Sequence, residues 1–145
     1  MKRYSDVTVS EEFRRLSDFK VWCEEQVGFN NDGWQLDKDI LVRGNKVYSK
    51  NTCCFVPPEI NYLVCDNNGR GKRGLPVGVD SCGDKYIARL RVGSGRTKRI
   101  RGFSTPDDAH KAYKYHKEQH IKHVATLWRG SLSKDVYDTL MSWEV

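Results

Sequence analysis

Residues 69–101 hold the chain's excess of positive charge. This segment carries 10 basic and 2 acidic side chains, whereas residues 1–68 carry 9 basic and 11 acidic ones and residues 102–145 carry 6 of each. A basic block this concentrated is typical of an anion-binding surface, and nucleic acid is the commonest large anion. The alternative is a solvated basic face that only keeps the protein soluble.

A second group of polar residues, between positions 36 and 61, has types and an order that could do chemistry. The pattern consists of Leu36-Asp37-Lys38-Asp39-Ile40, Gly44-Asn45-Lys46, Asn51-Thr52-Cys53-Cys54-Phe55-Val56-Pro57 and Ile60-Asn61. Over residues 34–63 it resembles the HNH endonucleases, whose fold is the ββα-metal module, and in particular their small homing-type members borne by phages. The aromatic segment before it is similar to the lead-in of such phage proteins.

This resemblance implies a divalent metal centre. Asp37 would supply a carboxylate oxygen and Asn61 an amide oxygen, and Mg²⁺ or Mn²⁺ prefers such ligands. The order strand, loop, strand, helix would bring these two residues together although 24 positions separate them. The metal would hold a scissile phosphate and neutralise the charge that develops on it. Asn51 would brace the loop by hydrogen bonding.

One position departs from the family's pattern. The family has a histidine, its general base, after the first aspartate, and this chain has Lys38 there. A lysine amine in water stays protonated at pH 7, so it accepts a proton only in unusual surroundings. Asp39 could activate a water molecule instead, although a carboxylate is a weaker base than imidazole. The sequence leaves open an active nuclease with an altered base and a fold that has lost catalysis.

Residues 74–125 resemble a second family. Strands are expected near 75–79, over 86–92 with a period of two, and over 96–103, with a Gly93-Ser94-Gly95 hairpin turn. Thr105 and Pro106 then start a helix. This order resembles the DNA-binding domain of plant ethylene-response factors, which homing-type HNH proteins often carry behind the nuclease.

Such a sheet would turn Tyr86, Ala88 and Leu90 toward the helix and its basic side chains toward duplex DNA. In the major groove, arginine pairs with guanine edges or phosphates. The DNA-binding candidates are Arg70, Lys72, Arg73, Lys85, Arg89, Arg91, Lys98, Arg99 and Arg101.

The expected fold class is α+β, in two modules that meet in a glycine- and asparagine-rich linker. Residues 1–68 would form an N-terminal helix and the HNH-like module, and residues 69–145 the basic β-β-β-α module with a short C-terminal helix. The first helix is expected over 10–27, capped by Ser10 and stopped by Gly28. Its apolar stripe would contain Phe13, Leu16, Phe19, Trp22 and Cys23.

Histidine and cysteine give weaker signals. All four histidines lie between positions 110 and 123, and no acid or cysteine completes a ligand pattern with them. The five cysteines contain no Cys-x-x-Cys pair, so no structural zinc is expected. Their odd number favours a reducing compartment, the cytoplasm, and that of a bacterial host if a phage encodes the chain. No stretch approaches the roughly 20 apolar residues of a membrane span.

These features predict a metal-dependent DNA endonuclease or nickase that uses Mg²⁺ or Mn²⁺ and binds double-stranded DNA. Two other interpretations stay open: a DNA-binding protein that keeps the fold without catalysis, and a phage inhibitor that binds a host protein. The sequence does not indicate the DNA target or the oligomeric state.

Overall fold

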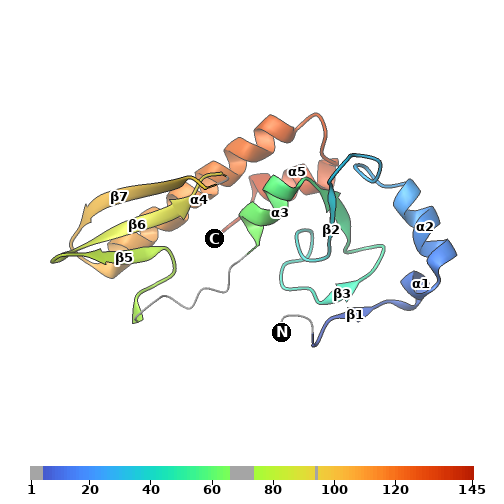
Figure 1. Cartoon of the computed structure of the whole chain (residues 1–145), viewed down its shortest axis with the longest axis horizontal. Coiled ribbons are helices and arrows are strands. Elements are labelled where there is room, and N and C mark those ends of the chain that lie inside the picture. Colours follow the sequence, from blue (N-terminus) through green and yellow to red (C-terminus); the bar gives the residue numbers. More distant parts are fainter. Residues whose placement is uncertain (1–4, 66–73, 94) are drawn as a thin grey trace.

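The computed structural model describes residues 5–65, 74–93 and 95–145, and its fold is α+β, as expected (Figure 1). The elements are β1 (Thr8–Val9), α1 (Glu11–Arg14), α2 (Leu16–Glu24), β2 (Gln35–Asp37), β3 (Val47–Tyr48), β4 (Cys54–Val56), α3 (Pro58–Val64), β5 (Val79–Cys82), β6 (Lys85–Arg91), β7 (Thr97–Phe103), α4 (Pro106–Trp128) and α5 (Lys134–Met141). Within the described residues, no helix combines the length and apolarity needed to cross a membrane.

The antiparallel pair of β2 and β4 separates two layers. Its register joins Gln35 to Val56, Leu36 to Phe55 and Asp37 to Cys54. Directly paired residues share a face of a sheet. Val56 and Cys54 therefore lie on the face that packs against Ile60 of α3, whereas Phe55 faces Trp22 and Phe29 of the N-terminal region. Asp37 lies on the α3 face because it is paired with Cys54.

Helix α4 belongs to both halves of the fold (Figure 1). Near its start, Tyr113 packs against Ala88 and Leu90 of the three-stranded sheet, which forms the smaller core. The larger core joins the β2–β4–α3 segment to the C-terminal helices. Its buried residues are Ile40, Cys54, Val56, Ile60, Val64, Ile121, Val124, Ala125, Leu132, Val136, Leu140 and Trp143. The packing partner of the C-terminal helix, which the sequence did not indicate, is α4, and the two helices share the larger core with α3 and the strands beside it.

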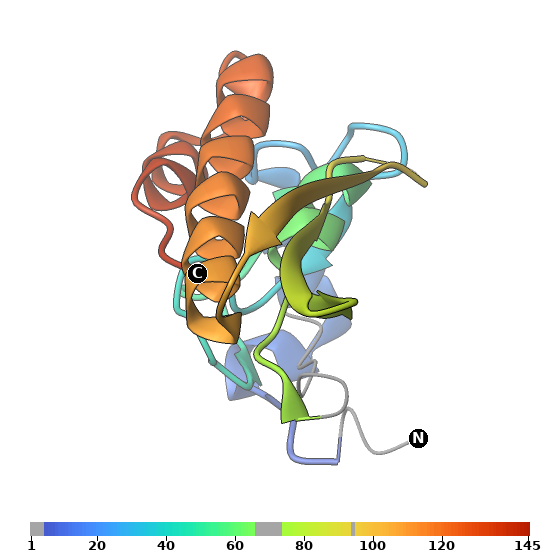
Figure 2. The same ribbon diagram turned by 90° about the vertical axis from the view of Figure 1, so that its left-hand side faces the viewer.

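The three-stranded antiparallel sheet β5-β6-β7 packs on α4, as expected from the sequence. Figure 2 shows the sheet and α5 on different sides of the helix. Thr105 caps α4, since its Oγ1 accepts a hydrogen bond from the Asp108 N–H at 3.2 Å. The first strand, expected near 75–79, begins only at Val79. Pro76 has no amide hydrogen for a ladder, and a turn closes between its carbonyl and the Val79 N–H.

The continuous helix expected over 10–27 is wrong, because the chain is extended at Arg15 (φ −89°, ψ 119°) and α1 and α2 are separate. The break brings the ring of Phe13 to 4.9 Å from that of Phe19 and 4.8 Å from that of Trp22. It also leaves Leu16, expected in the apolar stripe, 80% exposed. Aromatic contacts here outweigh the hydrogen bonds of an unbroken helix.

The expected helix boundaries also change. Ser10 has an extended backbone but makes no side-chain cap hydrogen bond. Helix α2 ends at Glu24, before Gly28. Gly28 serves a different purpose: its φ is +91°, and a Cβ there would lie 2.2 Å from the ring of Trp34. The glycine is required for the close approach of that indole.

Gly78 provides a test of the packing between the sheet and α4. Its φ is +76°, and a Cβ there would lie 2.2 Å from Cδ2 of Tyr113. Gly83 has a φ of +64° but no atom within 4 Å of its Cβ position, so Gly83→Ala is a matched control. Both substitutions incur the left-handed backbone cost of about 1 kcal/mol. We expect Gly78→Ala to lower the free energy of unfolding by about 1–3 kcal/mol more than Gly83→Ala does, because Tyr113 must move. Denaturant unfolding of both variants measures this difference. Equal losses would contradict this packing.

Candidate functional site

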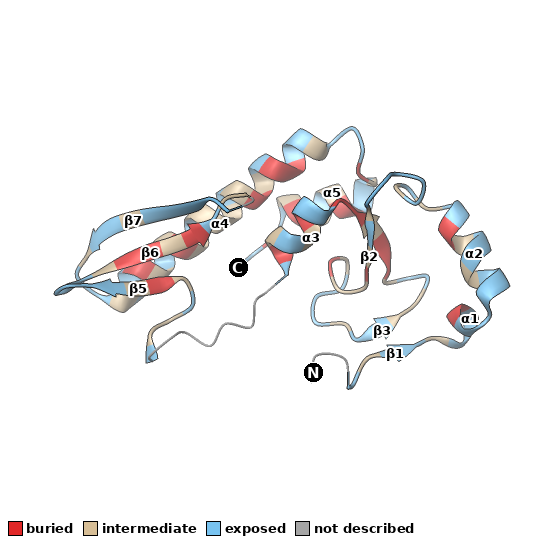
Figure 3. Ribbon diagram, viewed as in Figure 1, coloured by how far each residue is buried: buried red, intermediate tan, exposed pale blue. Residues whose placement is uncertain are grey.

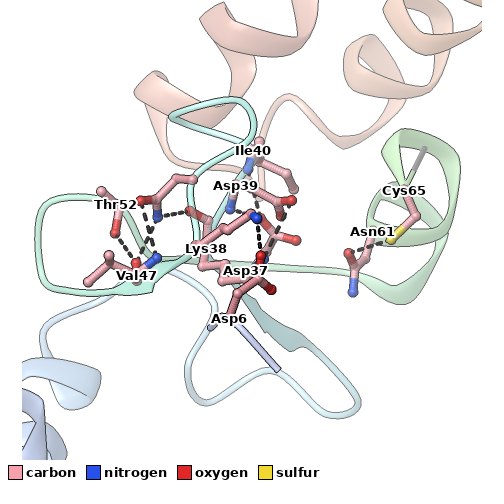
Figure 4. A network of polar contacts seen from close by, with 11 residues as sticks. Asp6, Asp37, Lys38, Asp39, Ile40, Val47, Thr52, Asn61 and Cys65 are labelled. Atoms are coloured by element: carbon pink, nitrogen blue, oxygen red, sulfur yellow. Dashed lines mark hydrogen bonds and ion pairs between the residues drawn. The ribbon is translucent and has the colours of Figure 1, made fainter. Parts of the chain in front are cut away.

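Asp37 ends β2 in a turn made by its own side chain. Its Oδ1 accepts hydrogen bonds from the N–H groups of Asp39 at 2.8 Å and Ile40 at 2.7 Å. Short polar side chains stop a strand in this way. Asp37 is only 8% exposed, and this desolvation raises the pKa of its carboxyl group. The N–H groups of Asp39 and Ile40 oppose that rise, and the Asp39 charge adds a smaller one. Residues 37–40 are called the Asp37 turn below (Figure 4).

Asn61 of α3 is connected to the same strand. Its Nδ2 donates to Oε1 of Gln35 at 2.7 Å. Gln35 and Asp37 are two positions apart on β2, so their side chains leave the same face of the strand. The Asn61 side chain therefore lies on the Asp37 face. Its Oδ1 accepts only a long contact from the Cys65 thiol, at 3.6 Å, and among the described residues no hydrogen bond joins it to Asp37.

Lys38 lies between an acid and an aromatic ring. Its Nζ is 3.5 Å from Oδ2 of Asp39 and 5.9 Å from the ring centre of Tyr48. The side chain is 14% exposed, whereas that of Asp39 is 45% exposed. Asp39 is therefore the more accessible of the two residues proposed for the position of the base.

The loop between β2 and β4 is braced by Asn45 and Thr52. The Asn45 amide donates to the carbonyls of Lys38 and Val47, both at 2.7 Å, and Thr52 Oγ1 donates to the Val47 carbonyl at 2.9 Å (Figure 4). Asn51, expected to brace this loop, is exposed and its side chain makes no hydrogen bond with the residues that the structure describes. Asn45 thus fixes the backbone of Lys38 within the Asp37 turn.

Oxygen atoms dominate the possible ligands of this site. Asp37, Asn61 and Asp39 offer carboxylate and amide oxygens, which fit a hard divalent cation such as Mg²⁺ or Mn²⁺. A cation would also offset the repulsion between the Asp37 and Asp39 carboxylates. In the ranges 5–65, 74–93 and 95–145, no three histidine, cysteine, aspartate or glutamate side chains gather into a metal-binding group.

The outer side of the three-stranded sheet is basic. We call it the basic face, and it consists of Lys85, Arg89, Arg91, Arg99 and Arg101. Arg89 is directly opposite Arg99 in the register, and Asp80 binds Arg89 at 2.7 Å. Figure 3 shows that the residues of β7 are largely exposed. Lys98 does not join the basic face, since it is paired with the buried Leu90 and so lies on the helix side.

The basic face continues onto the helix that carries Asn61. Arg91 donates a hydrogen bond to the hydroxyl of Tyr62, and its guanidinium lies 5.8 Å from the centre of that ring. Tyr62 follows Asn61 in α3. The three other basic candidates, Arg70, Lys72 and Arg73, lie outside the described residues.

Four cysteine and histidine side chains that could also react have surroundings that favour a structural role: Cys53, Cys54, His110 and His120. Burial raises the pKa values of the Cys53 and Cys54 thiols, which keeps both protonated, and Cys54 is opposite Asp37 in the register. Burial also lowers the pKa of His120. His110 makes a hydrogen bond of 2.8 Å to the Val77 carbonyl, which joins α4 to the approach to β5.

Gln35 and Tyr62 of the site were not predicted from the sequence, and Asn45 was noted only as part of the Gly44-Asn45-Lys46 motif, without a role of its own. The two-residue spacing of Gln35 and Asp37 and the position of Asn45 after the turn-forming Gly44 are signals for Gln35 and Asn45. Tyr62 has no such signal, because its contact with Arg91 depends on how α3 meets the sheet.

Comparison with known proteins gives no match: no protein-family model, curated protein or solved structure is significantly similar to this chain.

Proposed function

We propose that this chain is a metal-dependent DNA endonuclease or nickase of the homing HNH type. The observation that carries the proposal is the strand-loop-strand-helix unit with Asp37 buried at the end of β2 and Asn61 on the same face of that strand through Gln35. The motif resemblance implies these two residues as the metal ligands, and their position on one face of β2 supports that pairing.

The residues have separate roles in this proposal. Asp37 and Asn61 would hold Mg²⁺ or Mn²⁺, which when bound supplies a Lewis acid for the phosphate oxygens. Asp39 would accept a proton from the attacking water, because it is the more exposed neighbour of Asp37 and carries a carboxylate. Asn45 and Thr52 keep the loop rigid, so these groups would not have to reorganise during the reaction.

The basic face would dock the duplex. Five positive side chains on one side of a sheet suit the phosphates and guanine edges of DNA. The contact between Arg91 and Tyr62 supports the proposal, because it connects this face to the residue next to Asn61. A duplex on the sheet would then extend toward the metal ligands.

Lys38 favours a second candidate function, a DNA-binding protein without catalysis. The cation beside Asp39 stands where the resembled family has its base, and a protonated amine removes no proton from water. The basic face would serve equally well for occupying a DNA site.

Nicking of supercoiled plasmid by the purified chain tests the two candidates. We expect relaxed circles with Mg²⁺ or Mn²⁺ and none with a chelator. Both functions predict DNA binding that weakens steeply with salt, because bound phosphates release counterions. Salt-sensitive binding without nicking in either metal would support the non-catalytic function.

A further inference from the structure

Lys38 differs from the other basic residues of the β2–β4 loop. Lys46 is bound by Asp6, and Arg43 donates to the Glu144 carbonyl while its guanidinium lies 4.8 Å from the centre of the Trp143 ring. Lys50 is exposed. Lys38 is mostly buried within the Asp37 turn, and its backbone carbonyl accepts a hydrogen bond from the Asn45 amide at 2.7 Å.

The surroundings of the Lys38 ammonium leave it short of acceptors. An ammonium group has three N–H donors. Among the described residues its nearest carboxylate oxygen, on Asp39, is 3.5 Å away, which is longer than a normal hydrogen bond. The Tyr48 ring offers only a π face at 5.9 Å. A partly desolvated cation with unused donors gains much from an anionic oxygen nearby.

With a divalent cation bound, the net charge of the site favours binding of an anion only if Lys38 contributes its positive charge. The Asp37 turn carries two carboxylates and this one ammonium, a net charge of about −1 when both acids are ionised. A bound divalent cation would make it about +1, which a single phosphodiester charge neutralises. Without Lys38 the loaded site would have no net charge to attract the phosphate.

From this geometry we infer that Lys38 is a phosphate-binding residue, which donates directly to a non-bridging oxygen of the DNA phosphodiester at the Asp37 turn. This inference rests on the proposed function for the identity of the ligand, DNA. It assigns Lys38 a different role from that of a general base: the side chain donates hydrogen bonds to the phosphate, and its function is electrostatic. Such a fixed cation stabilises charge on a phosphoryl group without moving a proton.

The salt dependence of DNA binding, measured with Ca²⁺ in place of Mg²⁺ or Mn²⁺, tests the inference with a divalent cation at the site and has a readout other than cleavage. Each phosphate contact contributes about 0.9 to the slope of log Kobs against log salt concentration. With a short duplex as the probe, we expect Lys38→Gln to reduce the slope by about 0.9 and Lys38→Arg to retain it. Lys20→Gln is the matched control, because Lys20 is an exposed lysine whose one ion pair within the described part of the chain is with Glu24 on α2. A slope for Lys38→Gln equal to that of the unsubstituted chain overturns the inference.

A second measurement keeps the test valid if Lys38→Gln misfolds. Amine acetylation of the unsubstituted chain, read by peptide mass spectrometry, should slow at Lys38 when the duplex is added and stay constant at Lys20. Unchanged acetylation of Lys38 overturns the inference. Failure of the proposed function looks different: the plasmid stays intact with metal, while the Lys38 contact still appears in the slope and in the acetylation pattern.

Discussion

Replacement of Asp37 by asparagine is expected to abolish metal-dependent nicking and, at the same time, to stabilise the fold at neutral pH. Loss of the carboxylate removes the charged ligand of the proposed cation, and a metal contributes several kcal/mol to such a reaction. We therefore expect a rate reduction on the order of 1,000-fold. The stabilisation follows from burial: an ionised carboxylate is costly in this environment, and a neutral amide is less so.

Asparagine can keep the turn that aspartate makes. Its Oδ1 can accept the same hydrogen bonds from Asp39 N–H and Ile40 N–H, and its Nδ2 can donate to the neighbouring Asp39 carboxylate. We expect a gain of about 1 kcal/mol, or about 3 °C in Tm for a chain of this length.

The pH dependence of this gain has a definite sign. The pKa of Asp37 is raised in the folded state, so the folded protein binds more protons than the unfolded chain above the ordinary value of 3.8. Stability from this group is therefore present at low pH and lost as pH rises through the raised pKa. The Tm difference between Asp37→Asn and the unsubstituted chain should be small near pH 3 and largest near neutrality.

Thermal unfolding and plasmid nicking, measured on the same preparations, check both effects. Asp32→Asn, at an exposed turn position, is the matched control and should leave both measurements unchanged. Added Mg²⁺ should raise the Tm of the unsubstituted chain but not that of Asp37→Asn, because a ligand stabilises only the state that binds it. If the Asp37→Asn protein still nicks DNA, the catalytic metal binds at another site.

Local signals predicted much of this fold. Thr105, Pro106 and the acids after them mark the start of α4, and the alternation through Tyr86, Ala88 and Leu90 predicts which side of β6 meets that helix. These signals involve contacts within a few residues or a strict period of two. The expected place of Lys98 among the DNA-binding residues was wrong, because the register pairs it with Leu90 on the helix side.

What the sequence did not predict depends on contacts between distant segments. The break at Arg15 follows from the packing of Phe13 against rings on α2, which periodicity alone does not detect. In the site, Asp37 and Asn61 were chosen by motif, but the contact that connects them is made by Gln35, 26 positions from Asn61. Such a side-chain contact depends on how α3 lies against β2, which no local pattern records.

Loss of Arg89 and Arg99 is expected to have the largest effect on DNA binding while costing the fold little. The two residues are directly opposite each other on the basic face, and like charges opposite each other destabilise a sheet by up to about 1 kcal/mol. Asp80 offsets the charge of Arg89 only. Binding of one polyanion to both guanidinium groups would relieve this repulsion, because its phosphates neutralise both charges. Arg99→Ala alone should therefore raise Tm slightly at low salt, with the gain fading as salt screens the repulsion.

The double substitution Arg89→Ala with Arg99→Ala should weaken duplex binding about 100-fold at low salt, at about 1.4 kcal/mol for each contact. It should also reduce the slope of log Kobs against log salt concentration by about 1.8, because two phosphate contacts are lost. Lys111→Ala removes an exposed cation from α4, on the other side of the sheet, and should change neither quantity. Fluorescence anisotropy of a labelled duplex across a salt series measures both. If the double variant keeps the slope of the unsubstituted chain, the DNA does not dock on this sheet, and the charge of its outer side serves solubility.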